Sequence, residues 1–276
     1  LSLNLESAPG PDGFTNFFFM FYWDILQDEI IKAIKDFISH SFLPHGMNSC
    51  FLALIPMNEN ALEIKDFRPI TLGNTMPNLI SKILVNRMGG MVGDMITTNQ
   101  FGFVQGRSFQ WFLFMAFESI NLMLKNIKEG KFSLKIDISK VFDTLKWSVL
   151  LDVHRRYGFS QAFINMISTI IESSRLSILI NCVPRGFFPC TRGVRQGDPL
   201  SGIIFSIVEV YLRRCNNELA HMDLYKRIKA GRNFHAPSHL LYADDILLFG
   251  QASKRTISTI KALFNHYEEV VGQTIN

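Results

Sequence analysis

The chain has 276 residues, of which 47% are hydrophobic and 19% are charged, so it is expected to fold around a core rather than stay disordered. Its formal net charge of +4 is mildly basic, which permits a nucleic-acid partner without requiring one. No apolar run approaches the roughly 20 residues that a membrane-spanning helix needs, and the four cysteines show neither a C-x-x-C pair nor a zinc-site spacing.

In the first half of the chain, a turn-rich loop, APGPDGF, precedes a run of aromatic residues. A helix is expected over residues 16–40, and SCFLALIPM predicts a strand over 49–57. Apolar residues recur at helical spacing over 78–88, which predicts a second helix. A third helix, over 108–127, is apolar nearly all round, and we therefore expect it to be buried.

The second half of the chain alternates between strand and helix patterns. Asp198 and Pro199 stand where a helix N-cap and a first helical position are expected. Strands interrupted by helices, with hairpins among them, favour an α+β architecture. The expected elements are a strand at 132–138, helices at 146–156 and 160–173, a strand at 175–182 with a returning arm, a helix at 197–215, a hairpin at 238–250 and a helix at 253–270.

Three aspartates form the first candidate site. Asp244 and Asp245 lie side by side between two apolar arms, LLYA and ILLFG, and a tight turn would let both reach a cation. Asp137 ends the apolar strand FSLKIDI, where a charge is costly unless something neutralises it. Carboxylates on two strand ends suit magnesium and phosphoryl transfer. The alternative is structural, because turns and helix caps also use Asp, and Asp143 suits a cap better than Asp137 does.

A loop with the sequence TRGVRQGDPLSG forms the second candidate site. It combines Arg192 and Arg195 with two glycines and the start of a helix, whose terminal amides favour phosphate. Gln196, beside Gly197, is able to hydrogen-bond a nucleotide or a template. An ordinary capped helix with surface arginines explains the same residues, and the spacing alone leaves both interpretations open.

Basic residues near the front of the chain form a third group. Lys65 and Arg68 lie close together in EIKDFRPITL, and an arginine fork suits a triphosphate. Lys82, Arg87 and Arg107 extend the group into a plausible track for a nucleic-acid backbone. Taken one at a time, each of these residues is better explained as a solvated surface charge.

Seven motifs follow one another in the order of a known family. They are PGPDGF, LIPMNEN…IKDFRPITL, ISKILVNRM, QFGFVQGRS, KIDISKVFDTLKW, GVRQGDPLS and LLYADDILLF, and they cover residues 9 to about 276. The chain resembles the reverse transcriptase domain of plant LINE-type (non-LTR) retrotransposons. This resemblance implies an α+β right-hand polymerase with an antiparallel palm sheet backed by helices. Fingers and their connection to the palm would occupy residues 1–130 and the palm residues 131–276, with the thumb missing beyond Asn276.

The resemblance also implies an activity, RNA-directed DNA polymerisation by a nucleotidyltransferase. It implies an RNA template, a DNA primer, dNTP substrates and two Mg²⁺ ions. An intracellular location, nucleus or cytoplasm, is expected, with no membrane association, and the oligomeric state stays open.

Site residues carried over from the family fall into two sets. Asp137, Asp244 and Asp245 would be the catalytic residues and metal ligands, with Asp245 in a less direct role. Phe142 would be the aromatic gate that excludes a 2′-hydroxyl. The residues that contact nucleotide, template or primer would be Lys65, Arg68, Phe142, Gln196, Gly197 and Tyr242.

The chain departs from the family's pattern at several positions. Met57 stands where the family usually has Lys, and Pro77 and Asn78 stand where it has Tyr-Lys, so two expected positive charges are replaced. Residues 111–112, Trp-Phe, replace a frequent Asp-Asn pair. Gly202 replaces the usual Pro, at a cost of about 1 kcal/mol relative to Ala if the position is helical. Two further interpretations therefore stay open: a decayed domain that binds RNA–DNA duplex without turnover, and a group II intron maturase-like protein.

Overall fold

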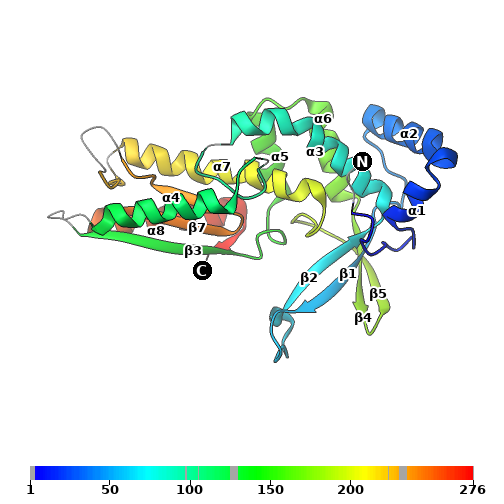
Figure 1. Ribbon diagram of the computed structural model, residues 1–276, viewed down its shortest axis with the longest axis horizontal. Helices are drawn as coiled ribbons and strands as arrows, with labels where there is room; N and C mark the ends of the chain where they lie inside the picture. Colours follow the sequence, from blue (N-terminus) through cyan, green and yellow to red (C-terminus); the bar gives the residue numbers. More distant parts are fainter. Residues whose placement is uncertain are drawn as a thin grey trace. The chain divides into compact units, whose positions relative to one another are not determined.

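The computed structural model describes residues 4–96, 98–104, 106–124, 130–222, 224–229 and 235–275 (Figure 1). The chain divides into two compact units, each assembled from two separate stretches of sequence. Unit 1 comprises Leu1–Arg87 and His154–Ser201, and unit 2 comprises Met88–Val153 and Gly202–Asn276. The boundary expected at residue 130 coincides with none of the three junctions between these stretches, and the assignment of fingers and palm to residue ranges stays a prediction.

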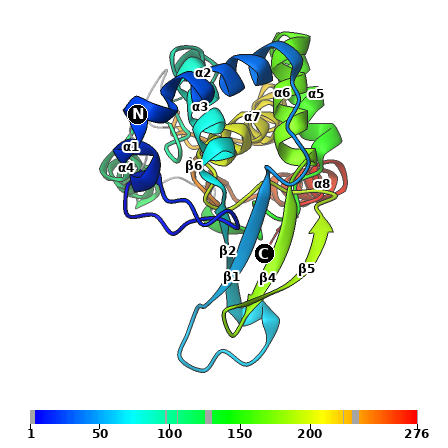
Figure 2. The ribbon, with the colours of Figure 1, turned by 90° about the vertical axis from the view of Figure 1, so that its right-hand side faces the viewer.

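Unit 1 is built on a four-stranded sheet with the order β2-β1-β4-β5 (Figure 2). Strand β1 runs antiparallel to β2 and parallel to β4, and β4 and β5 form an antiparallel hairpin. Strand β2 was not predicted, because Pro69 and its charged neighbours resemble a loop. The proline is tolerated in this strand because β2 lies at the edge of the sheet. The strands are β1 (Ser49–Pro56), β2 (Phe67–Gly73), β4 (Arg175–Ile180) and β5 (Val183–Pro189).

The helices of unit 1 begin with a break in an expected helix. The prediction over 16–40 is interrupted at Tyr22, whose φ of −95° and ψ of 20° depart from helical geometry. Helix α6 is capped by the Ser160 hydroxyl, which accepts a hydrogen bond from the backbone N–H of Phe163, and it buries one apolar face. The elements are α1 (Asn16–Phe21), α2 (Trp23–His40), a 3₁₀ turn (Ile64–Asp66) and α6 (Gln161–Glu172).

Three longer elements span the junctions between the sequence stretches of the two units: α3 (Thr75–Met95), α5 (Trp147–Arg156) and α7 (Pro199–His221). Helix α7 begins at Pro199, as the sequence predicted. Within the described ranges, no helix is long and apolar enough to cross a membrane.

Unit 2 is built on an antiparallel sheet with the order β6-β7-β3-β8. Side chains alternate along β3: Ile136 and Ile138 are buried, whereas Lys135 and Asp137 are exposed on the opposite face. The strands are β3 (Lys131–Ser139), β6 (His239–Tyr242), β7 (Asp245–Gln251) and β8 (Thr274–Ile275). The mixed α+β class expected from the sequence is confirmed.

Helices α4 (Phe109–Leu124) and α8 (Lys254–Val271) complete unit 2, and α4 runs along the sheet (Figure 1). The expectation that α4 is buried all round is wrong. Its inner face, which includes Phe112 and Ala116, packs into a core with Leu240 and Phe249. The sheet covers that side alone, and large apolar residues on the outer side stay exposed, including Trp111 (60%) and Phe117 (65%). Residues 125–127 of the predicted helix lie outside the described residues.

Candidate active site

The three predicted acids of unit 2 meet at one end of its sheet. Asp137 on β3 pairs in register with Asp245 on β7, which lies 108 positions later in the chain. Asp244 lies with Ala243 in the two-residue turn between β6 and β7, and Ala243 has a φ of 52°. The backbone N–H of Ile138 donates to the Asp244 carbonyl at 3.1 Å. Strand pairing therefore places the three carboxyl groups on neighbouring backbone positions.

A lysine that the sequence analysis missed stands among these acids. Lys135 Nζ lies 2.9 Å from Asp245 Oδ1, and the two side chains are 64% and 36% exposed. The hydrogen bond to Asp245 raises the pKa of the Lys135 ammonium, and the charges of Asp137 and Asp244 add to that effect. Lys135 precedes Asp137 by two positions, so the strand period puts both on one face and was the signal available in the sequence.

The acids have the donor chemistry that magnesium requires, since Mg²⁺ prefers carboxylate oxygens. Asp137 and Asp244 are exposed at the end of the sheet. Asp245 is engaged by Lys135, and in the part of the chain that the structure describes, no three His, Cys, Asp or Glu side chains are already gathered as a metal site. The residues fit the ion by chemistry, although one oxygen of Asp245 is paired with Lys135.

Two predicted aromatic residues pack close to this end of the sheet. The Tyr242 ring contacts the first turn of α4, with ring centroids 4.9 Å from Phe109 and 5.4 Å from Phe112. Phe142 is half-buried and lies 5.8 Å from Phe103 and 5.9 Å from Phe205. Tyr242 and Phe142 are therefore both set by packing, whatever further role each one has.

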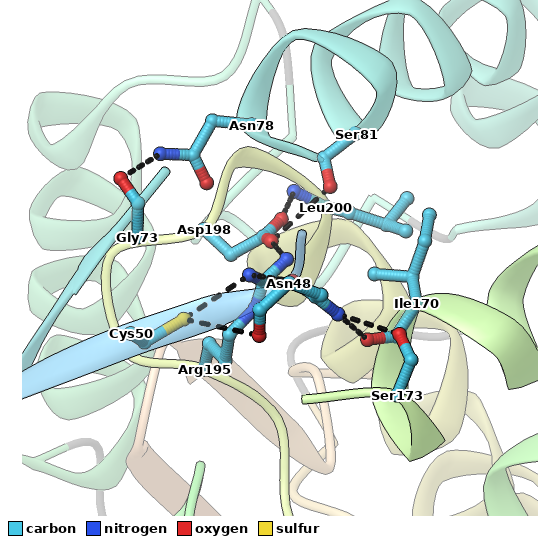
Figure 3. A network of polar contacts seen from close by, with 10 residues as sticks. All are labelled: Asn48, Cys50, Gly73, Asn78, Ser81, Ile170, Ser173, Arg195, Asp198 and Leu200. Carbon is cyan, nitrogen blue, oxygen red and sulfur yellow. Dashed lines mark hydrogen bonds and ion pairs between the residues drawn. The ribbon is translucent and has the colours of Figure 1, made fainter. Parts of the chain in front are cut away.

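Unit 1 holds the loop that precedes α7 through a buried polar network (Figure 3). Asp198 Oδ1 accepts the Leu200 backbone N–H at 2.8 Å, which confirms the predicted N-cap. Its other oxygen accepts the Ser81 hydroxyl at 3.1 Å and pairs with the Arg195 guanidinium. Arg195 also donates to Asn48 Oδ1 at 2.6 Å.

Burial changes the role expected for Arg195. The sequence suggested that Arg192 and Arg195 supply positive charge at the loop surface. Arg195 is instead 9% exposed and committed to Asp198 and Asn48, so it holds the loop rather than facing a phosphate. Arg192 is exposed.

The remaining predicted residues of unit 1 lie on or beside β2. The Thr71 backbone N–H donates to the Gln196 carbonyl at 3.1 Å. Gly197 has a φ of 111°, and a Cβ there would lie 3.3 Å from the Thr71 carbonyl oxygen, so the loop follows the strand closely. Arg68 lies on β2 with an exposed side chain, and exposed Lys65 pairs with Glu63 at 2.7 Å. Four of the predicted site residues thus lie in unit 1 and five lie in unit 2.

A comparison with protein families gives a match over most of the chain. The family described as "Reverse transcriptase (RNA-dependent DNA polymerase)" matches residues 55–276. The chain belongs to the reverse transcriptase family. The resemblance drawn from the motifs is thereby confirmed at this level.

Relatives of this reverse transcriptase domain come from non-LTR retrotransposons. A transposon TX1 protein of Xenopus laevis is 27% identical over 250 residues, which are 89% of this chain and 18% of the relative. A Pol polyprotein from the R2 retrotransposable element of Nasonia vitripennis is 26% identical over 254 residues, which are 89% of this chain and 22% of the relative. The chain therefore spans about a fifth of the length of these relatives.

Solved structures with the same fold include telomerases. The structure of apo telomerase from Candida tropicalis, truncated from its C-terminal domain, matches with a TM-score of 0.54 and 13% identity, over 90% of this chain and 54% of that one. Telomerase from Candida albicans, in complex with a fragment of telomeric RNA, matches with a TM-score of 0.56 and 13% identity, over 95% of this chain and 47% of that one. At this identity the likeness shows the fold of a reverse transcriptase and nothing further.

Proposed function

We propose that the chain is the polymerase domain of a plant LINE-type retrotransposon protein and that it copies an RNA template into DNA. The pairing of Asp137 with Asp245, with Asp244 in the adjoining turn, carries this proposal. Family membership supports the reaction class. A plant source is supported by a stretch of 70 residues that is 34% identical to an uncharacterised mitochondrial protein of Arabidopsis thaliana.

The acids of unit 2 act on the reacting groups. Asp137 and Asp244 would hold two Mg²⁺ ions, and Asp245, which pairs with Lys135, would complete the cluster. When bound, the ions would supply Lewis-acid activation of the primer 3′-hydroxyl and charge stabilisation for the leaving pyrophosphate. Asp137 and Asp244 are exposed and come from neighbouring strand ends, which lets both reach into solvent toward a triphosphate.

Each turnover forms one bond and breaks one. The 3′-oxygen of the DNA primer bonds to the α-phosphorus of the dNTP, and the bond from that phosphorus to the bridging oxygen breaks. Pyrophosphate leaves with the electron pair, and the hydroxyl proton passes to solvent. Phe142 stands under the sugar and excludes a 2′-hydroxyl, while Tyr242 packs near the primer end.

Residues of unit 1 bind the triphosphate and the template. Arg68 projects from β2 with an exposed guanidinium, which suits bidentate contact with phosphate, and Lys65 adds charge nearby. Gln196 and Gly197 contact the template and the incoming nucleotide. Their backbone is held against β2 at Thr71, so little ordering is required when a nucleotide binds.

A primer-extension assay tests the proposal. Purified protein is given poly(rA) primed with oligo(dT), together with dTTP and Mg²⁺. We expect incorporation that falls at least 100-fold in Asp137→Asn and in Asp244→Asn, because each change removes a charged ligand. Glu118→Gln, an exposed carboxyl on α4 in the same unit, is the matched control and keeps wild-type incorporation. Equal incorporation in wild type and both Asp variants refutes the proposal.

A second candidate is a domain that binds RNA–DNA duplex without turnover. It is favoured by Met57, which is 56% exposed where the family resemblance expects a lysine. It is also favoured by Asn78, which donates to the Gly73 carbonyl at 3.4 Å where a further lysine is expected. Duplex binding that persists in wild type with no incorporation under any Mg²⁺ concentration selects this candidate.

A further inference from the structure

Three phenylalanine rings come together beside the acids of unit 2. Phe142 lies five positions after Asp137, Phe205 lies on α7, and Phe103 lies in the segment between α3 and α4. The centroids are 5.8 Å apart for Phe103 and Phe142, 6.4 Å for Phe103 and Phe205, and 5.9 Å for Phe142 and Phe205. Phe205 is fully buried, whereas Phe103 is 44% exposed and Phe142 half-buried. The three rings therefore form a compact triangle in which Phe103 and Phe205 both pack against Phe142.

The Phe103 ring packs against the backbone of Gly202 in the first turn of α7. A Cβ added at Gly202 would lie 2.6 Å from Cδ1 and 2.9 Å from Cγ of Phe103. Those distances are shorter than any carbon contact, so a side chain at position 202 would displace the ring. Gly202, which departed from the family pattern, thus has a local reason: it leaves the space that Phe103 fills.

The backbone on the N-terminal side of Phe103 is clamped to strand β6. The Phe101 N–H donates to the Leu241 carbonyl at 2.8 Å, and the Leu241 N–H donates to the Asn99 carbonyl at 2.9 Å. A Cβ at Gly102 would lie 2.3 Å from the backbone nitrogen of Ala243, in the turn that carries Asp244. The clamp thus ties this segment to the turn of the acids.

The backbone of Phe103 has a φ of 61°, a left-handed conformation that residues other than glycine rarely adopt. Such a conformation persists where the surroundings over-determine it, and it recurs at functional sites. The strand clamp, the seat at Gly202 and the ring contacts provide that determination. The direction of the Phe103 ring is therefore built into the fold.

We propose that Phe103, seated at Gly202, is a positioning residue that sets the Phe142 ring and so determines how strongly the site discriminates dNTP from rNTP. This inference rests on the proposed function, in which Phe142 is the sugar gate. Phe103 meets Phe142 edge to face, with an interplanar angle of 76°, which is a favoured geometry for aromatic pairs. Without Phe103, the Phe142 ring keeps one of its two aromatic neighbours among the described residues, Phe205, and is able to tilt away from the sugar.

Single-nucleotide incorporation of dTTP and of rUTP tests the proposal. Phe103→Leu is expected to raise the ratio of kcat/KM for rUTP over dTTP about 3- to 10-fold, mainly through the KM for rUTP. Phe103→Tyr keeps the ring and is expected to keep the wild-type ratio. Phe117→Leu removes an exposed ring on α4, and its ratio is expected to be unchanged.

Gly202→Ala reaches the same ring from the other side. It is expected to raise the ratio in the wild-type background but to add nothing in a Phe103→Ala background, where no ring is left to displace. Additive effects of the two substitutions overturn the inference. An unchanged ratio in Phe103→Leu, beside a raised ratio in Phe142→Ala, also overturns it and leaves the proposed function standing.

A readout that does not need turnover completes the test. Phe142 is replaced by 4-fluorophenylalanine, and its ¹⁹F resonance is recorded in the wild-type, Phe103→Leu and Phe117→Leu backgrounds. A resonance that moves or broadens in Phe103→Leu alone supports the inference, even if no nucleotide is incorporated. A resonance that is identical in all three backgrounds overturns it, whatever the fate of the proposed function.

Discussion

A buried acid in unit 2 makes the stability of the protein depend on pH. Glu209 on α7 is fully buried, and its Oε1 lies against the Tyr267 hydroxyl. That hydroxyl is also 2.5 Å from Gln273 Oε1, while the Gln273 amide nitrogen donates to the Val141 carbonyl at 2.7 Å. The Tyr267 hydroxyl is the donor in both contacts, and one proton shared between two acceptor oxygens stabilises a Glu209 carboxylate only weakly. Among the described residues, Glu209 Oε2 has no hydrogen-bond partner, which also disfavours a charge.

Burial raises the pKa of Glu209 from 4.5 to about 7, and the hydrogen bond with Tyr267 opposes this rise. Below pH 4.5 the folded and unfolded chains both carry the proton. Between pH 4.5 and pH 7 the unfolded chain loses it first, so the free energy of unfolding falls as the pH rises. At about 1.4 kcal/mol for each pH unit, the total loss above pH 7 is roughly 3 kcal/mol.

Glu209→Gln keeps the shape of the neutral acid and cannot ionise. We expect its free energy of unfolding, relative to wild type, to increase by roughly 3 kcal/mol between pH 4.5 and pH 8, or about 6 to 12 °C in Tm. Differential scanning calorimetry of both proteins across that range measures the difference. His239, whose pKa burial lowers to about 4 with Arg213 adding to the effect, titrates identically in both proteins and cancels. A difference in Tm that stays constant with pH would refute the reasoning.

Three further predictions concern single contacts. Asp198→Ala leaves the buried Arg195 guanidinium without its carboxylate partner and is expected to lower the free energy of unfolding by about 3–5 kcal/mol, measured with urea. Asp198→Asn keeps a capping oxygen and is expected to lower it less. Equal losses in the two variants would contradict this interpretation of the ion pair. Lys135→Met removes the cation beside the acids and is expected to tighten Mn²⁺ binding about two- to fivefold by electron paramagnetic resonance, and weaker binding would show that Lys135 is not a competitor. Gly102→Ala places a Cβ 2.3 Å from the backbone nitrogen of Ala243 and is expected to destabilise the protein by about 1–3 kcal/mol or more. The control is Gly90→Ala, where a Cβ meets no atom within 4 Å and is expected to stabilise the helix by about 0.5–1 kcal/mol. Similar Tm values for the two variants would refute the close contact at Gly102.

The acids were predictable from the sequence because each one ends or joins an apolar strand pattern. Asp137 follows a buried alternation, and Asp244 and Asp245 sit between two apolar arms, so local periodicity placed both strands. The pairing of those two strands was not predicted, and the register of β3 against β7 shows it. The N-cap at Asp198 was equally local and is confirmed.

The contacts that the sequence did not reveal depend on tertiary neighbours. Arg195 resembled a surface arginine because nothing local indicates that Asn48 lies beside it. Strand β2 was missed because Pro69 is tolerated at a sheet edge, and edges are set by tertiary pairing. The exposure of α4 was mispredicted because the apolar sequence of a helix does not show how many of its sides other elements will cover. The seat of Phe103 at Gly202 is likewise a contact across about 100 positions.

In the proposed function, Asp137 and Asp244 carry RNA-directed DNA synthesis. The rate of first dTMP addition to an oligo(dT) primer on poly(rA), at saturating dTTP and Mg²⁺, tests it most directly. We expect measurable addition by wild type and by Glu118→Gln, and a loss of at least 100-fold in Asp244→Asn. Addition by Asp244→Asn at the wild-type rate would contradict the claim.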